Sequence, residues 1–435
     1  MEEYQKFTYE NGVRLLVAQS AHLHSVEVVC YVGVGSRYER ADQAGLSHFL
    51  EHMMFRGNAR YATGPQIEQA FEAIGGSVNA ATDAETTSYY ASVHPDFVDE
   101  AIDLFAVLLQ TPRFEGLETE RSIVLEEALS DFNEHGDDVC PDNLMGRMMW
   151  REHSLALPVI GFPQTIRQFR LADLRDWHHK HYTPDNLVIS VAGPVDPQQI
   201  AATVGKAWGQ WQGCCHGAAL PYREIDQPEA TVRTCWVRDS DSQISLQLAW
   251  RTDGRQSATS LGLRALRHLL GDGGACRLMQ SLREEAGLTY SVDASLEEYA
   301  ECGCFSIDLA TEPEKLIPVV KILLEEVERA RQLVADDELQ RVVRTGLYRL
   351  HFSRDNVEEL ASRYGWGEIS NDMHTLSDDA KEWQQVNPAM IQQAAQQCLT
   401  PQRMFFVCVG PWRQEDRNVV EALLQSVSGD TDGLV

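Results

Sequence analysis

The apolar residues of this chain follow two spacings, one typical of strands and one typical of helices. Runs rich in valine and leucine at 26–34 and 244–251 predict strands. Apolar side chains three and four positions apart predict helices at 46–57, 65–74, 260–270 and 276–285. Strands and helices are mixed along the whole sequence, so we expect an α+β protein.

The predicted elements occur twice in the same order, which indicates a duplication. Each half continues with a strand pair and then two helices: 77–93, 95–110 and 117–134 in the first half, and 290–310, 313–333 and 336–353 in the second. At 435 residues the chain is long enough for two domains with cores of their own. We therefore predict an N-terminal domain at 1–213, a linker at 214–228 and a homologous C-terminal domain at 229–435.

The helix predicted at 46–57 carries chemically related groups on one side. Its apolar stripe consists of Leu46, Phe49, Leu50, Met53 and Met54. His48, Glu51 and His52 cluster on the opposite side, and at about 100° per residue the two imidazoles lie one turn apart and can reach one ion. Zinc binds imidazole nitrogen and lowers the pKa of a bound water to roughly 7, and Glu51 is placed to take the proton from that water. The alternative is an exposed helix face that merely contains these residue types.

A second helical pattern at 118–131 is rich in carboxylates and offers a third ligand. Glu127 follows Glu120 by nearly two turns, so these two share a face with Asp131, whereas Glu126 points about 100° away. Glu127 is therefore the better candidate for the ligand. Glu120 is predicted to be an auxiliary catalytic carboxylate of the kind that orients a metal ligand. The alternative role for Glu120 is that of an acidic residue at the helix N-terminus that interacts favourably with the helix dipole.

Together these motifs resemble the pitrilysin/insulinase family of zinc peptidases, in the smaller branch that includes the mitochondrial processing peptidase. The order His-x-x-Glu-His is the inverzincin signature. In the family, the third ligand ends a Glu-Arg-x-x-Val-x-x-Glu pattern seventy-odd residues downstream, and Glu120 and Glu127 match its two ends. The resemblance also covers 75–80, 153–161 and 182–187, and it extends over nearly the whole chain.

The resemblance implies a specific architecture. The fold would be two homologous α/β domains, each a mostly antiparallel sheet covered by helices, which form half of a clamshell chamber. The second half lacks a His-x-x-Glu-His motif, and alignment of the two halves places Thr345 opposite Glu127. We therefore expect one Zn²⁺ per chain, held by His48, His52 and Glu127. Family members close the chamber with four such domains, which implies a dimer.

The resemblance also implies residues that contact the substrate. Asn79 and Ala80 match an edge strand that pairs with an extended peptide through main-chain hydrogen bonds. Arg283 and Tyr290 match an Arg and a Tyr that, in the family, are directed at the substrate near the zinc. There they could donate hydrogen bonds to an oxyanion and so act as catalytic residues. In the dimer they would reach the zinc of the partner. The alternatives are an ordinary buried strand for Asn79 and Ala80, and a packing tyrosine at a turn for Tyr290.

Charge and hydropathy exclude other classes of function. With 37 basic and 65 acidic residues the formal charge is −28, which argues against a nucleic-acid partner. The acidic residues would favour cationic peptides if they line a chamber, or would only aid solubility if they face outward. No apolar run is long enough to span a membrane, and the acidic N-terminus leads directly into a strand pattern, so we expect no membrane partner, no targeting peptide and a cytoplasmic location.

These observations combine into one functional prediction. The chain is predicted to be a zinc-dependent endopeptidase that hydrolyses peptides or unfolded segments inside a dimeric chamber. The dimer would be a homodimer, or a heterodimer with an inactive homologue. The alternative is a non-catalytic scaffold subunit of a heteromeric assembly that retains the peptidase fold. A zinc hydrolase for a non-peptide bond is disfavoured by the resemblance alone.

Overall fold

The computed structural model describes residues 3–222 and 232–429 and divides the chain into two compact units, each built around one sheet. The first unit contains the residues up to 130 together with 157–220 and 349–379. The second contains 131–156, 221–348 and the residues from 380 onward. The domain boundaries predicted from the duplication stay a prediction, and residues 223–228 of the predicted linker lie outside the described residues.

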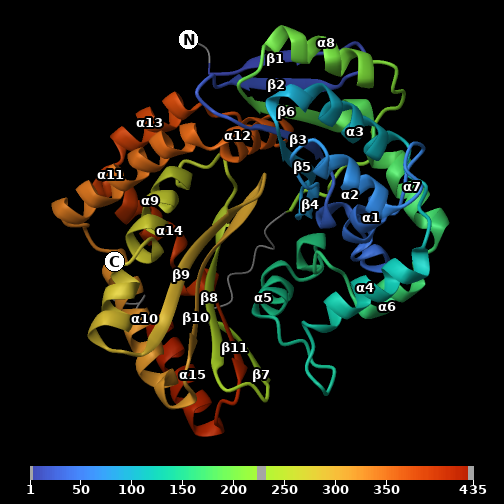
Figure 1. Ribbon diagram of the computed structural model, residues 1–435. Coiled ribbons are helices and arrows are strands. Elements are labelled where there is room, and N and C mark those ends of the chain that lie inside the picture. The colour runs from blue at the N-terminus through green and yellow to red at the C-terminus, as the bar shows by residue number, and fades with distance from the viewer. Residues whose placement is uncertain (1–2, 223–231, 430–435) are drawn as a thin grey trace. The chain divides into compact units, whose positions relative to one another are not determined.

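The first unit is organised around a six-stranded sheet with the order β1-β2-β6-β3-β5-β4 (Figure 1). Its strands are β1 (Gln5–Thr8), β2 (Arg14–Gln19), β3 (Val26–Val32), β4 (Asn79–Thr82), β5 (Thr87–Val93) and β6 (Leu187–Gly193). Only β2 and β6 pair in parallel, and every other neighbouring pair is antiparallel. Because β4 is the last strand in this order, one of its edges has no partner strand within the sheet.

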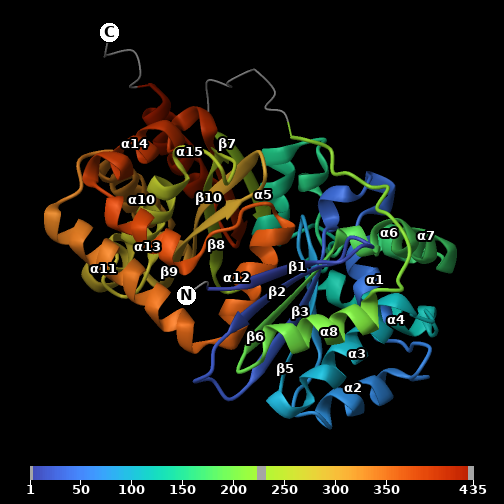
Figure 2. The ribbon, with the colours of Figure 1, turned by 90° about the horizontal axis from the view of Figure 1, so that it is seen from above.

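Helices cover both faces of this sheet. The helices of the first unit are α1 (Leu46–Met54), α2 (Gly64–Glu72), α3 (Val98–Gln110), α4 (Leu117–Leu129), α6 (Pro163–Gln168), α7 (Leu171–His181), α8 (Pro197–Trp208) and α12 (Val357–Ile369). Alternate residues of β3, such as Val28 and Cys30, share one hydrophobic core with α1, α3 and α8. Figure 2 shows α8 along β2 and β6, close to α3.

The opposite face of the sheet is covered by α12, a helix from the second half of the sequence. This helix packs on β2, β3 and β6. Asn356 caps its start by accepting hydrogen bonds from the backbone N–H groups of Glu358 and Glu359 at 2.9 and 3.3 Å. A Cβ atom on Gly365 would lie 2.7 Å from the Tyr31 ring, so the absence of a side chain there allows the close approach of helix and sheet.

The second unit contains a five-stranded sheet with the order β7-β11-β8-β10-β9, in which β7 and β11 pair in parallel. Its strands are β7 (Arg233–Arg238), β8 (Ile244–Asp253), β9 (Thr289–Glu298), β10 (Cys302–Thr311) and β11 (Met404–Gly410). The helices are α5 (Pro141–Trp150), α9 (Ser260–Gly271), α10 (Leu316–Ala330), α14 (Pro388–Cys398) and α15 (Gln414–Gly429). The helices α11 (Asp336–Phe352) and α13 (Leu376–Gln385) contain residues of both units.

The two halves of the sequence exchange one helix each. The helix α5 follows α4 in the first half but packs on β8 and β11 of the second unit. The helix α12 follows α11 in the second half but packs on the sheet of the first unit. The duplication predicted from the element order is therefore visible in the structure, but each half is completed by a helix of the other.

The structure confirms the α+β class and two mostly antiparallel sheets covered by helices. The pattern at 276–285 predicts a helix, and the chain there forms a π-helix at Met279–Glu285. Apolar spacing in so short a segment does not distinguish hydrogen bonds four residues apart from bonds five residues apart. Within 3–222 and 232–429, no helix combines the length and the apolar character needed to cross a membrane.

Candidate active site

The helix α1 presents the predicted metal residues because its apolar stripe is buried on the other side. Leu46, Phe49, Leu50, Met53 and Met54 are all at most 1 % exposed and belong to the core of the first unit. The helix begins after Gly45, whose φ of 90° is in the left-handed region that favours glycine. Burial of the stripe leaves His48 and His52 partly exposed on the face that looks toward α4.

The structure brings His48, His52 and Glu127 together as predicted. The distance from His48 Nε2 to Glu127 Oε1 is 3.7 Å, and from His52 Nε2 to Glu127 Oε2 it is 3.6 Å. One ligand atom from each residue lies within 4.8 Å of the other two. Bond lengths of about 2.0 to 2.2 Å in a tetrahedral zinc site place ligand atoms roughly 3.3 to 3.6 Å apart, so this donor set fits zinc.

The surroundings of the two histidines act on their protonation in opposite directions. Burial, together with the neighbouring His52, lowers the pKa of His48 to about 4, so this ring is neutral near pH 7. The Nδ1 atom of His52 lies 2.9 Å from Glu120 Oε1 and donates its proton there. Burial lowers the pKa of His52, but the hydrogen bond to Glu120 and the charges of the nearby carboxylates raise it overall, so a cation between His52 Nε2 and Glu127 would take the place of a proton on Nε2. Both rings can therefore offer nitrogen to a cation.

Glu51 lies on the same helix and is 8 % exposed. Burial and the nearby Glu127 raise its pKa, while a hydrogen bond from Thr82 and the charge of His52 oppose the increase. Thr82 Oγ1 donates to Glu51 Oε2 at 2.8 Å and so holds the carboxylate in place. A carboxylate with a raised pKa is a stronger general base than an exposed one. The sequence did not indicate Thr82, because its role depends on the placement of β4 beside α1.

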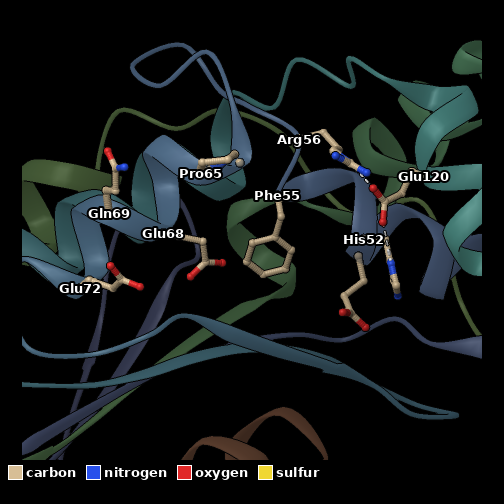
Figure 3. Close-up of a pocket in the computed structure, with 10 residues that line it drawn as sticks. His52, Phe55, Arg56, Pro65, Glu68, Gln69, Glu72 and Glu120 are labelled. Atoms are coloured by element: carbon tan, nitrogen blue, oxygen red, sulfur yellow. Dashed lines mark hydrogen bonds and ion pairs between the residues drawn. The ribbon is translucent and has the colours of Figure 1, made fainter.

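Arg56 is a site residue that the sequence analysis missed. Glu120 is 6 % exposed and is hydrogen-bonded on one oxygen to His52 and on the other to Arg56 Nε (Figure 3). These two bonds lower the pKa of Glu120 although burial opposes the decrease. Arg56 follows His52 by four positions, so the helical spacing contained a signal for this contact. The prediction that Glu120 orients a ligand agrees with this geometry, although its part in catalysis stays a prediction.

We expect Arg56→Met to weaken zinc binding without unfolding the protein. Without the guanidinium, Glu120 is free to rotate and no longer fixes the tautomer and orientation of His52. Loss of a group that orients a metal ligand typically lowers metal affinity by about 10-fold to 100-fold. Competition with a zinc chelator would measure the change. Arg56→Lys should restore part of the affinity, and equal affinities in all three proteins would contradict the orienting role.

Glu39 supports the start of α1 from outside the helix, and it too was missed. Its carboxylate accepts the backbone N–H of Gly45 at 2.7 Å and that of Ser47 at 2.6 Å. Gly45 has no side chain to cap the helix, so Glu39 satisfies donors that would otherwise be unpaired. Its side chain is buried, and burial raises its pKa to about 8. Nothing in the local sequence pattern identifies such a cap, because it comes from a separate segment.

We expect Glu39→Ala to destabilise the protein, because two buried N–H groups lose their acceptor. Each unpaired donor costs about 1 to 3 kcal/mol. Glu39→Gln keeps one acceptor oxygen and should lose less stability than the alanine variant. Urea unfolding of the three proteins would give the free energies of unfolding. A stability of the alanine variant equal to that of the wild type would contradict the capping role.

The predicted substrate residues Asn79 and Ala80 lie on β4, at the edge of the first sheet as expected. Ala80 pairs with Tyr89 of β5 on one side only. The same strand carries Thr82, which contacts Glu51, so the strand with the unpaired edge runs beside the candidate base. This arrangement agrees with the predicted role in peptide binding, which itself stays a prediction.

Arg283 and Tyr290 belong to the second unit and lie close to each other. The Arg283 guanidinium carbon lies 5.0 Å from the centre of the Tyr290 ring, within the range of a cation–π contact. Tyr290 is 82 % exposed, which argues against the alternative of a tyrosine packed at a turn. Arg283 lies in the π-helix, a local structure that often occurs at functional sites. The catalytic roles of both residues stay predictions.

Similar proteins support the zinc interpretation of this site. The chain is 30 % identical over 400 residues to an uncharacterized zinc protease of Bacillus subtilis, covering 91 % of this chain and 96 % of the relative. It is 32 % identical over 327 residues to an uncharacterized zinc protease of Mycobacterium tuberculosis, covering 74 % of each chain.

Solved structures share the fold of the whole chain. The crystal structure of a protease from Helicobacter pylori has a TM-score of 0.85 and 20 % identity, covering 94 % of this chain and 99 % of that one. A structure from Pseudomonas fluorescens, described as a peptidase M16 inactive domain, has a TM-score of 0.81 and 22 % identity, with coverages of 94 % and 98 %. At these identities the likeness concerns the fold alone.

Family models match both halves of the chain. Residues 14–162 match the insulinase model of peptidase family M16, and this segment contains His48, His52 and Glu127. Residues 168–345 match the model of the M16 inactive domain, in agreement with the prediction that the second half holds no zinc motif. The relatives, the fold and these models together show that the chain belongs to the M16 peptidases, the pitrilysin/insulinase family.

Proposed function

We propose that this protein is a zinc-dependent endopeptidase that hydrolyses peptides or unfolded segments, with one zinc ion held by His48, His52 and Glu127. The observation that carries the proposal is the convergence of these three donors beside a buried carboxylate, Glu51. The relatives described as zinc proteases support the same assignment.

The residues of the chain divide the chemistry among them. Bound zinc would polarise the scissile carbonyl and acidify a water molecule. Glu51 takes a proton from the attacking water and then delivers it to the leaving amine, while Thr82 holds the carboxylate in position. The unpaired edge of β4 binds the substrate main chain as an added strand, which places little demand on side chains. This mode of binding suits unfolded segments, since only an extended backbone can pair along its whole length.

Zinc analysis combined with peptide cleavage would test the proposal. We expect one zinc ion per chain, cleavage of a mixed peptide library, loss of cleavage on treatment with a chelator, and recovery when zinc is added. Elemental analysis and mass spectrometry of the products would measure these effects. A protein without stoichiometric zinc that leaves every peptide intact would favour the alternative of a scaffold subunit.

We further propose that the active form is a cytoplasmic homodimer, in which Arg283 and Tyr290 of one subunit contact the substrate at the zinc of the other. The chain carries both the metal residues and this exposed pair, so two identical chains supply a complete site. Light scattering on the purified protein would measure the mass. A monomer that cuts peptides only after an inactive homologue is added would favour the heterodimer.

A further inference from the structure

A second group of side chains of metal-binding types lies in the segment 372–382, outside the candidate active site. One ligand atom from each of His374, Asp379 and Glu382 lies within 4.8 Å of the other two. Among residues 3–222 and 232–429, only this group and the zinc residues described above meet that condition. One imidazole and two carboxylates form a donor set that divalent transition-metal ions accept. The segment is therefore a candidate for a second metal site.

A tight turn at the end of α12 fixes the first part of this segment. Asn371 has a φ of 55°, in the left-handed region that asparagine adopts more readily than most residues. The N–H of Asp372 donates to the carbonyl of Gly367 at 2.8 Å. The N–H of Asn371 donates to the carbonyl of Glu368 at 3.4 Å. These two bonds close the helix in a Schellman motif, so His374 follows a turn whose backbone is held by hydrogen bonds.

Hydrogen bonds at the start of α13 fix the second part of the segment. Glu3 accepts the backbone N–H of Leu376 at 2.8 Å and that of Ser377 at 3.0 Å. These bonds satisfy two of the N–H groups that a helix leaves unpaired in its first turn. Asp379 and Glu382 are three positions apart on α13, so their side chains lie on one face of the helix. One continuous helix therefore presents both carboxylates.

The imidazole of His374 has a carboxylate near each ring nitrogen. Its Nδ1 lies 3.6 Å from Asp379 Oδ1, and its Nε2 lies 3.7 Å from Asp372 Oδ1. The side chain of Asp372 is only 7 % exposed. A carboxylate on the far nitrogen of a metal-binding imidazole fixes the tautomer and the orientation of the ring. Asp372 is placed for this role at His374, as Glu120 is at His52.

Asp379 has one carboxylate oxygen that lacks a hydrogen-bond partner. Its side chain is 13 % exposed, and Oδ2 accepts a hydrogen bond from Arg363 of α12. The other oxygen, Oδ1, is buried and accepts no hydrogen bond from the part of the chain that the structure describes. A buried acceptor left unpaired costs free energy, and a buried charge costs more. A cation between Asp379 Oδ1 and His374 would remove this cost.

We propose that His374, Asp379 and Glu382 bind a second divalent transition-metal ion, for which Mn²⁺ is the probe, and that Asp372 orients His374. Mn²⁺ suits the site because two of the three ligands are carboxylates. The first site has two imidazoles, so zinc fills that site before this one. The bound ion fastens the turn after α12 to α13. Through Arg363 it also holds α12, the helix that covers the first sheet.

Binding of Mn²⁺ to the zinc-loaded protein would test the second site. Electron paramagnetic resonance measures the free Mn²⁺, and elemental analysis of the same sample measures zinc. We expect one Mn²⁺ per chain without loss of zinc, because Mn²⁺ binds a given site more weakly than zinc does. His374→Ala should abolish the uptake, and Glu382→Gln should weaken it by more than about tenfold, since it removes a ligand charge. His351→Ala, which removes an exposed histidine from α11, should bind Mn²⁺ as the wild type does.

Further variants test the role of each part. Asp372→Asn should lower the affinity for Mn²⁺ by about 10-fold to 100-fold, because the imidazole loses the group that orients it. Glu127→Ala, which lacks a ligand of the first site, should still take up one Mn²⁺. Addition of Mn²⁺ should raise the unfolding temperature of the wild type and leave that of His374→Ala unchanged, since only a folded form that binds the ion is stabilised.

Three results would overturn the second site. The first is no uptake of Mn²⁺ by the zinc-loaded wild type, and the second is uptake matched by an equal loss of zinc, which would place the ion in the first site. The third is equal uptake by the wild type, His374→Ala and Glu382→Gln. Circular dichroism would verify the fold of each variant. Glu382→Gln changes a partly exposed side chain, so it decides the question even if His374→Ala does not fold.

Discussion

Glu51→Gln is expected to lower kcat by about 100-fold to 10,000-fold and to leave zinc binding intact. The amide has nearly the same shape as the carboxylate and can still accept the hydrogen bond from Thr82, but it cannot take a proton from water. The range is the usual contribution of a positioned general base. Because Glu51 is not among the three donors that converge on one point, the zinc content should stay that of the wild type.

Single-turnover cleavage of a fluorogenic peptide would measure this loss, with elemental analysis on the same sample. Thr82→Val is the matched comparison, since it removes only the hydrogen bond that positions the carboxylate. We expect it to reduce kcat less than the substitution of the base itself. Equal cleavage by the wild type and Glu51→Gln would show that Glu51 is not the base, whatever the zinc content.

Glu127→Ala is expected to remove zinc, while Glu126→Ala is expected to keep it. The two residues are neighbours on α4, but only Glu127 is within 4 Å of both histidines. Replacement of a group that merely orients a ligand costs about 10-fold to 100-fold in affinity, so loss of a direct ligand should cost more than about 100-fold. Glu127 is 49 % exposed on its side chain, and its removal should therefore leave the fold intact.

Chelator competition would give both affinities, and circular dichroism would verify the fold. Glu126→Ala controls for the loss of one acidic residue from the same helix turn. If the two variants bind zinc equally, the third ligand has been assigned to the wrong residue. If Glu127→Ala retains full affinity while Glu126→Ala loses it, the helical phase deduced for α4 is wrong.

The spacing of residues along the chain predicted the site where the chemistry lies on one helix face. The apolar stripe of α1 fixed which side His48 and His52 occupy, and the same geometry separated Glu127 from Glu126 on α4. Arg56 follows the same helical spacing, but its position in the sequence does not show that its guanidinium bonds to Glu120 on another helix. Each of these contacts depends on position along one helix or on one pair of helices.

Contacts from distant segments could not be predicted in this way. Thr82 reaches Glu51 from a strand, and Glu39 caps α1 from a loop, so both depend on how separate elements pack. The exchange of α5 and α12 between the two units could not be predicted from the sequence for a related reason. An amphipathic pattern shows that a helix has a face to bury, but it does not say which sheet will bury that face.

The exchange of these two helices delays completion of the first unit during synthesis, because one of its helices is made near the end of the chain. The sheet of the first unit contains strands that leave the ribosome within the first half of translation, but α12 at Val357–Ile369 emerges only near the end. Until then one face of β3 and β6, two strands buried along their whole length in the finished protein, has no cover. The nascent chain therefore exposes this face of the sheet from the synthesis of β6 until α12 emerges, a state that favours chaperone binding and aggregation.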